Sequence, residues 1–278
     1  MPLEEVPDDP GARRRRPVVV AIVMVLLAGL GVGAWVLRRT EAGPLPPPDA
    51  PWPTTGEASV FLCGSGSAQD NCDGRAIMAA QRLMVERTLR GLPEVSAVRF
   101  QSRAETLKDF KKAWALSATA REAFRESDMP ESFVVDLTST GDFLRKVETL
   151  PGVSNVYVRG TSFWAGKADV AIRLCPRTAP GKNSPCLGRG EASAAEKATI
   201  YQTLRDLDGI GAIYLEDRRH ATKDAFWAMF ARSPDDTKLF AYIPESYHLV
   251  LDGPGAVDRV RRAVSGLPGV NNIEQELS

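Results

Sequence analysis

The residues best suited to chemistry in this chain are four cysteines and two histidines. The cysteines occur as two spaced pairs, Cys63 with Cys72 and Cys175 with Cys186. Neither spacing matches a C-x-x-C metal motif, and no histidine lies beside either pair. A disulfide within each pair would close a loop of about ten residues and stabilise its domain by roughly 2 to 3 kcal/mol. We therefore predict two disulfides, with free structural thiols as the alternative.

The histidines offer little for catalysis. His220 is predicted to lie in a solvated loop among charged residues, and His248 on a strand whose counterpart elsewhere in the chain carries Val134. A nucleophilic hydrolase needs a base beside its serine or cysteine, and the sequence has neither a G-x-S-x-G elbow nor a P-loop. We predict no enzymatic activity, no metal and no cofactor.

Composition narrows the class of partner. The 278 residues carry 35 basic and 35 acidic side chains, so the formal net charge is zero. Such a balance supplies no excess positive charge for a phosphate backbone, and nucleic acid is not expected as a partner. A hydrophobic content of 44% excludes wholesale disorder.

The N-terminal region has an asymmetric pattern of charged and apolar residues. Four arginines, Arg13 to Arg16, precede an uncharged apolar run over residues 17–37, and two arginines follow it. At about 1.5 Å per residue a helix of this length crosses a hydrocarbon core of about 30 Å. The alternative, a cleaved signal peptide, normally has an apolar region of only about 7 to 15 residues.

We therefore predict a single transmembrane helix at 17–37 in the cell membrane. The charge bias places the tail, residues 1–16, in the cytoplasm and the bulk of the chain outside it. An outside location is consistent with disulfides, which persist in oxidising compartments. Gly29 and Gly33 form a G-x-x-x-G pair that would permit a dimer through close helix packing.

Residues 38–56 are predicted to be a proline-rich linker. Six prolines fall between Gly43 and Pro53, and such a segment has few amide donors and restricted backbone angles. It is expected to be an extended spacer of about 3.1 Å per residue.

Beyond the linker the sequence contains an internal repeat. We assign copy 1 to residues 57–160 and copy 2 to residues 167–278. Each has an apolar segment ending in cysteine, a second cysteine, a Pro-Glu-Ser strand starting at Pro130 or Pro244, and a Leu-Pro-Gly-Val segment starting at Leu150 or Leu267. Four landmarks in the same order at nearly constant spacing indicate two related domains of ordinary size.

Within copy 1 the periodicities alternate between strand and helix. Ile77, Ala80, Met84 and Leu89 recur near helical spacing, whereas the segment from Glu131 to Leu137 has the two-residue period of a strand. The resulting order, β-α-β, inserted helices, β-α-β, predicts an α+β fold. We expect two tandem ferredoxin-like (split βαβ) sandwiches, each with an inserted helical lobe.

Each predicted lobe is rich in aromatic side chains. Such helices either close a minor core or present an apolar patch to a partner. The candidate partner-binding residues are Phe110, Trp114 and Phe124 in copy 1 and Phe226, Trp227 and Phe230 in copy 2.

The motif order of copy 1 resembles the extracellular domain of the FtsX family. The segments that carry the resemblance are 60–63, 92–100, 106–110, 129–137 and 150–156, with a weaker second set from Ala168 to Leu277. FtsX proteins have four spans and couple to an ATPase, whereas this chain has one predicted span and a duplicated outer domain.

The resemblance implies a membrane-anchored, extracytoplasmic protein-binding module of the bacterial cell-division machinery. Its implied partner is a peptidoglycan hydrolase or another divisome component, docked on the helical lobe. A second hypothesis is an envelope sensor that holds a small ligand or cell-wall fragment between the two repeats, in a cleft around Phe163 and Trp164.

Overall fold

The computed structural model describes residues 43–113, 122–178, 184–232 and 243–276. The predicted cytoplasmic tail and transmembrane helix, with Gly29 and Gly33, lie outside these ranges, as does Trp114. Among the residues within them, no helix is both long enough and apolar enough to cross a bilayer.

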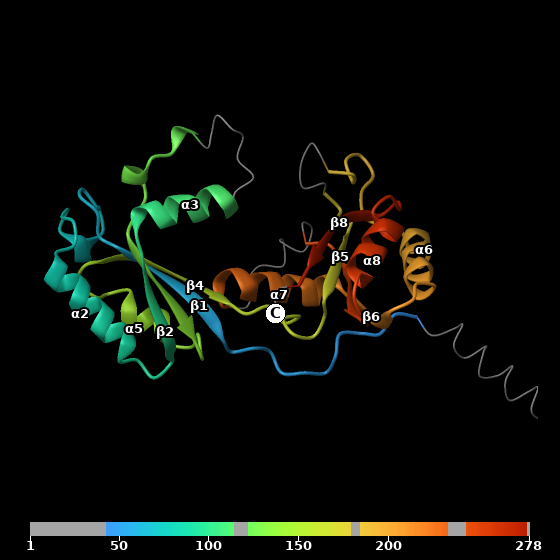
Figure 1. Cartoon of the computed structure of the whole chain (residues 1–278), viewed down its shortest axis with the longest axis horizontal. Coiled ribbons are helices and arrows are strands. Elements are labelled where there is room, and N and C mark those ends of the chain that lie inside the picture. Colours follow the sequence, from blue (N-terminus) through green and yellow to red (C-terminus); the bar gives the residue numbers. More distant parts are fainter. Residues whose placement is uncertain (1–42, 114–121, 179–183, 233–242, 277–278) are drawn as a thin grey trace, which may run out of the picture. The chain divides into compact units, whose positions relative to one another are not determined.

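The N-terminal half of the described chain forms a four-stranded antiparallel sheet with the order β2-β3-β1-β4. Two helices, α2 and α5, lie beside this sheet, and a third, α3, is inserted between β2 and β3 (Figure 1). The elements are β1 (Gly56–Leu62), η1 (Asp70–Cys72), α2 (Ala79–Arg90), β2 (Val95–Gln101), α3 (Arg103–Ala113), η2 (Glu126–Asp128), β3 (Ser132–Leu137), α5 (Phe143–Val147) and β4 (Val153–Gly160).

The C-terminal half has the corresponding strand order, β6-β7-β5-β8, in a second antiparallel sheet. Helices α6 and α8 lie against each other (Figure 1). The elements are β5 (Val170–Leu174), α6 (Ala194–Arg205), β6 (Ile210–Glu216), α7 (Arg218–Phe230), β7 (Ser246–Leu251), α8 (Ala256–Val264) and β8 (Val270–Gln275).

The predicted α+β class is therefore present, with two four-stranded antiparallel sheets. The ferredoxin-like assignment remains an interpretation of the strand order. Alternation along β3 is as predicted, since Phe133, Val135 and Leu137 are all buried. They pack with the helices into the core of the N-terminal half, and the other half has its own core around Ile172, Ile200 and Leu249.

Helix α2 differs from the sequence-based expectation in the face that it buries. Its buried side chains are Val85 and Leu89, whereas Ala80 and Met84, which were expected on the core face, are exposed. The register error arises because Ala and Met fit either face of a helix by type. Helix α6, which has the same length as α2, also buries its seventh and eleventh residues, Ile200 and Leu204.

The proline-rich linker is extended, but it does not stand free over residues 45–53. The Leu45 N–H donates to the Ile213 carbonyl at 2.9 Å, and the Leu45 carbonyl accepts from the Leu215 N–H at 2.8 Å. Further along, the Trp52 ring contacts Phe163 with 4.9 Å between centroids. The segment is therefore extended but also attached to the C-terminal half, because Ala50 and Trp52, which lie between its prolines, pack against the buried cluster of Phe163, Trp164 and Ala168.

Both predicted disulfides are present, Cys63–Cys72 and Cys175–Cys186. Each joins the segment after the first strand of its half to the loop that leads into the following helix. In the N-terminal half the loop is also fixed by Asn71, whose side-chain amide donates to the carbonyl of Val153 at 2.5 Å.

Candidate functional site

The inserted segment of the N-terminal half brings two of the predicted partner-binding residues together. Phe110 on α3 meets Phe124 edge-on, with 4.8 Å between ring centroids and 65° between ring planes. Both rings are half-buried, so they combine mutual packing with accessible apolar surface. Edge-to-face packing of this kind stabilises an aromatic pair beyond the effect of burial alone.

The predicted residues on α7 occupy a different setting. Phe226 and Phe230 contact each other at 5.6 Å, and the Phe230 ring lies 6.4 Å from Tyr157 on β4. The Trp227 indole packs on Gly160 at the end of β4, and its Nε1 makes no hydrogen bond. Helix α7 thus places aromatic side chains against a strand of the N-terminal half, and no ring contact joins them to Phe110 or Phe124 among the described residues.

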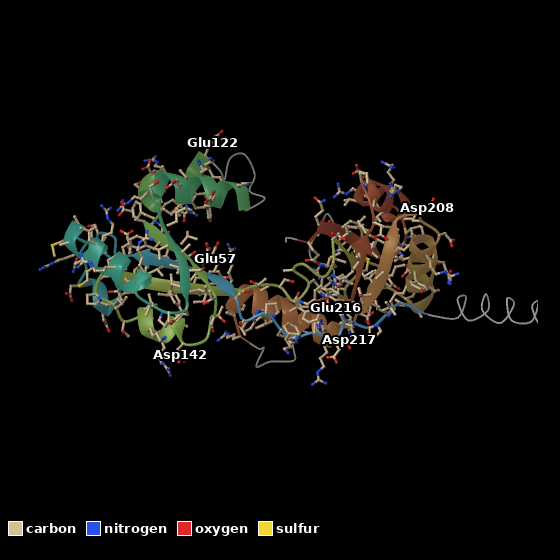
Figure 2. All side chains as sticks on the ribbon, turned by 60° about the horizontal axis from the view of Figure 1, so that its bottom comes forward. Glu57, Glu122, Asp142, Asp208, Glu216 and Asp217 are labelled. Carbon is tan, nitrogen blue, oxygen red and sulfur yellow. A yellow bond between two sulfur atoms is a disulfide. The ribbon has the colours of Figure 1, made fainter. Side chains whose placement is uncertain are left out.

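Sequence reasoning did not foresee a buried polar centre in the C-terminal half. Glu216, which is fully buried at the end of β6, accepts hydrogen bonds from the Trp164 indole at 2.8 Å and from the Ser246 hydroxyl at 2.8 Å. Figure 2 labels Glu216 beside Asp217, which caps the N-terminus of α7 through the His220 N–H at 2.7 Å. The signal that could have found this centre was a lone glutamate closing an apolar strand.

Both histidines contact Glu216. His220 does not lie in a solvated loop, as expected, but on α7, with Nδ1 2.7 Å from Glu216 Oε1. His248 is fully buried on β7, with Nε2 2.9 Å from Glu216 Oε2 and Nδ1 3.1 Å from Glu276 Oε1. The second of these contacts is close enough for an ion pair but is not aligned as a hydrogen bond.

The electrostatics favour ionised Glu216. Burial opposes ionisation, but hydrogen bonds from His220 and His248, attraction to His248 and the Trp164 donor outweigh it and hold the Glu216 pKa far below its ordinary value. Asp224 behaves in the opposite way, because burial and repulsion from Glu216 raise its pKa despite a hydrogen bond from the Phe163 N–H.

Glu216 and His248, at the middle of this polar centre, are fully buried. The Trp164 indole is stacked on His248, with 3.8 Å between ring centroids and 8° between planes. Phe163 and Trp164 are both buried, so they pack in the core and do not line an open cleft. The arrangement braces the segment between the two sheets, and it offers no support for a ligand site around these two residues.

No group of three or more potential metal-ligating side chains occurs in the part of the chain that the structure describes. The arrangement as a whole is that of an α+β module that is fastened by disulfides and carries an aromatic inserted segment.

Residues 57–161 match the model of the FtsX extracellular domain family. The resemblance read from the sequence is therefore confirmed for this segment, which coincides with the N-terminal half. The matched residues do not include the predicted second copy.

Among solved structures, the chain is similar to extracellular domain 1 of FtsX from S. pneumoniae, crystallised in complex with undecyl-maltoside. The identity is 16%, the TM-score is 0.27, and the match covers 36% of this chain and 91% of that one. None of the curated proteins compared with this chain matches it.

Proposed function

We propose that this chain is a membrane-anchored, extracytoplasmic protein-binding module of the bacterial cell-division machinery that docks or regulates peptidoglycan hydrolases. The observation that carries the proposal is the match of residues 57–161 to the FtsX extracellular domain. The two disulfides support an oxidising location, and the apolar run at 17–37, between arginine clusters, supports a single-pass anchor with a cytoplasmic N-terminus.

The docking surface that we propose is the aromatic part of the inserted segment in the N-terminal half. Phe110 and Phe124 form an accessible edge-to-face pair, and Trp114 lies between them in the sequence. Trp227 is a weaker candidate, because its indole already packs on Gly160 within the chain. We therefore assign binding first to the N-terminal half.

We further propose that the C-terminal half is a second FtsX-like domain of ferredoxin-like topology. Its sheet has the corresponding strand order, and both first strands have a register shift at the same place, between Phe61 and Leu62 and between Arg173 and Leu174. The buried Glu216 centre has no equivalent charge in the other half, where Gln101 bonds to Ser132. This half is thereby suited to a structural role.

The test is binding of purified peptidoglycan hydrolases from the source organism to the full chain in nanodiscs. We expect one of them to bind, and Phe110→Ala with Phe124→Ala to weaken binding by about tenfold or more. The matched control is Phe226→Ala, which removes an aromatic ring from the corresponding helix. Absence of binding by every hydrolase tested, or equal loss in the control, would contradict the proposal.

A further inference from the structure

The N-terminal half contains a pocket of about 570 Å³ at one end of its sheet. It lies where the disulfide loop, the first turn of α2, the start of α3 and the segment that leads into β3 meet. A pocket of this volume accommodates a small ligand. Its charged lining residues are Arg82, Arg103, Asp128 and Glu131.

The C-terminal half provides an internal comparison, because its backbone is built in the same way at this place. In each half, the residue two positions before the first long helix donates its N–H to the carbonyl of the first cysteine: Ile77 at 2.9 Å and Ala192 at 3.1 Å. The residues directly before these two, Ala76 and Glu191, are therefore equivalent.

The inserted helices are equivalent at their first residues. Helix α3 begins at Arg103, two residues after the end of the edge strand β2, and α7 begins at Arg218, two residues after the end of the edge strand β6. An arginine thus stands at the same place in both halves, and the two arginines differ in what surrounds them.

In the C-terminal half a carboxylate of the chain occupies this place. Glu191 Oε1 accepts a hydrogen bond from Arg218 Nη2, and Oε2 accepts one from Arg177 Nε at 3.0 Å. Burial opposes ionisation of Glu191, but the hydrogen bond from Arg177 and the attraction of Arg218 hold its pKa below the ordinary value. The position is therefore adapted to an ionised carboxylate.

In the N-terminal half that carboxylate is missing. Its equivalent, Ala76, lines the pocket and is exposed, and Ser65 stands where the other half has Arg177. Arg103 makes no ion pair with any residue in the described ranges. Two small side chains in place of two long ones leave the pocket open, and Arg103 lacks the partner that its counterpart has.

A second pair of charges in the pocket belongs to the fold. Arg82 and Glu131 lie 3.6 Å apart, and the equivalent residues of the C-terminal half, Lys197 and Glu245, form the same pair at 2.7 Å. Because both halves keep this pair, we assign it a structural role and do not count it as part of a ligand site.

The remaining anion of the pocket is Asp128. Its carboxylate accepts hydrogen bonds from the Arg125 N–H at 2.9 Å and from the Ser127 hydroxyl at 3.3 Å, but no cation within the described part of the chain pairs with it. One pocket thus holds an unpaired cation, Arg103, and an unpaired anion. A ligand that complements both carries a carboxylate and a cationic group.

We propose that this pocket binds a zwitterionic amino acid or short peptide. The carboxylate of the ligand pairs with Arg103, in the way that the Glu191 carboxylate pairs with Arg218, and its ammonium group pairs with Asp128. The apolar lining residues contact the rest of the ligand. They include Ile77, Met78 and Met129. The site does not depend on the function proposed for the aromatic pair on the inserted segment.

The experiment measures binding to the full chain in phosphatidylcholine nanodiscs by isothermal titration calorimetry. The probes are alanine, trialanine, N-acetyl-trialanine and trialanine amide. The first two distinguish a free amino acid from a peptide as the source of the zwitterion. The last two each lack one of the two charges.

The main variant is Ala76→Glu, which gives the N-terminal half the carboxylate of the other half. The matched control is Ala80→Glu, which adds the same charge to an exposed position of α2 that does not line the pocket. We expect alanine or trialanine to bind, Ala76→Glu to weaken that binding at least about tenfold, and the control to leave it unchanged.

Two further variants test each charge separately. Capping either end of trialanine should weaken its binding at least about tenfold in the wild-type chain. Arg103→Gln should remove the difference between trialanine and its amide, and Asp128→Asn should remove the difference between trialanine and its N-acetyl form. Neither variant relies on a new charge being accommodated in the pocket.

Three results would overturn the proposal. The first is the absence of binding by both alanine and trialanine, and the second is equal affinity for capped and uncapped trialanine. The third is an Ala76→Glu variant that binds as tightly as the Ala80→Glu control, which would show that the ligand does not occupy the place of the missing carboxylate.

Discussion

The indole of Trp227 lies so close to Gly160 that a side chain at position 160 would overlap it. Trp227 belongs to α7 and Gly160 ends β4, so this contact joins an inserted helix of the C-terminal half to a strand of the N-terminal half. The absence of a Cβ at Gly160 is a packing requirement, because this glycine does not have a positive φ.

Gly160→Ala should therefore destabilise the chain by about 1 to 3 kcal/mol, through displacement of the Trp227 indole. Gly266→Ala is the matched control, since a Cβ there meets nothing and the backbone is also unstrained. Its effect should be neutral or stabilising by about 0.4 to 1 kcal/mol. Denaturant unfolding measures both, and equal stability of the two variants would refute the packing argument.

Removing the charge of Glu216 should be among the most destabilising single changes in the C-terminal half. Glu216→Gln leaves His220 and His248 without their buried anionic partner. We expect the free energy of unfolding to fall by about 3 to 5 kcal/mol. Glu274→Gln removes an exposed carboxylate paired with Arg173 and should cost less than about 1 kcal/mol. Equilibrium unfolding at neutral pH measures the stability of both variants. Similar losses of stability in the two variants would contradict the argument that the buried carboxylate contributes more than the exposed one.

The same carboxylate predicts a pH dependence. Its folded-state pKa lies far below the ordinary value of 4.5, so its contribution to stability is complete above that pH. The contribution is lost as the pH falls from there through the folded-state pKa. The difference in unfolding free energy between wild type and Glu216→Gln should therefore be larger in buffer above about pH 4.5 than in more acidic buffer, where it shrinks. A difference that grows on acidification would contradict this assignment.

The disulfides should act independently, because each closes a local loop, with sequence separations of 9 and 11 residues. Cys63→Ser with Cys72→Ser should lower stability by about 2 to 3 kcal/mol, as should the change of Cys175 and Cys186 to serine. The variant that combines all four substitutions should lose an amount of stability equal to the sum of the two separate losses. Denaturant unfolding of the wild-type chain under oxidising and reducing conditions measures the same contribution. A wild-type unfolding curve that does not change when a reducing agent is added would contradict the prediction that the disulfides stabilise the fold.

Local patterns predicted much of this architecture. The alternation of Phe133, Val135 and Leu137 located a central strand, and the cysteine spacing located both disulfides. These features depend on neighbours in the sequence, and a single chain displays them directly. The family match at residues 57–161 agrees with the motifs from which the resemblance was drawn.

Contacts between residues far apart in the chain could not be predicted from the sequence. Leu45 joins β6 and Trp52 packs on Phe163, although both lie in a segment whose prolines suggested only extension. His220 was expected to be solvated because charged residues surround it in the sequence, but α7 turns it toward Glu216. Such contacts depend on the packing of distant segments, for which local composition carries no signal.

The most direct test of the central claim is recruitment of a peptidoglycan hydrolase to division sites in cells that express either the wild-type chain or the variant with Phe110→Ala and Phe124→Ala. At equal protein abundance, we predict that the hydrolase gathers at the septum with the wild type and disperses with the variant. Septal recruitment that persists in cells lacking the chain altogether would contradict the account.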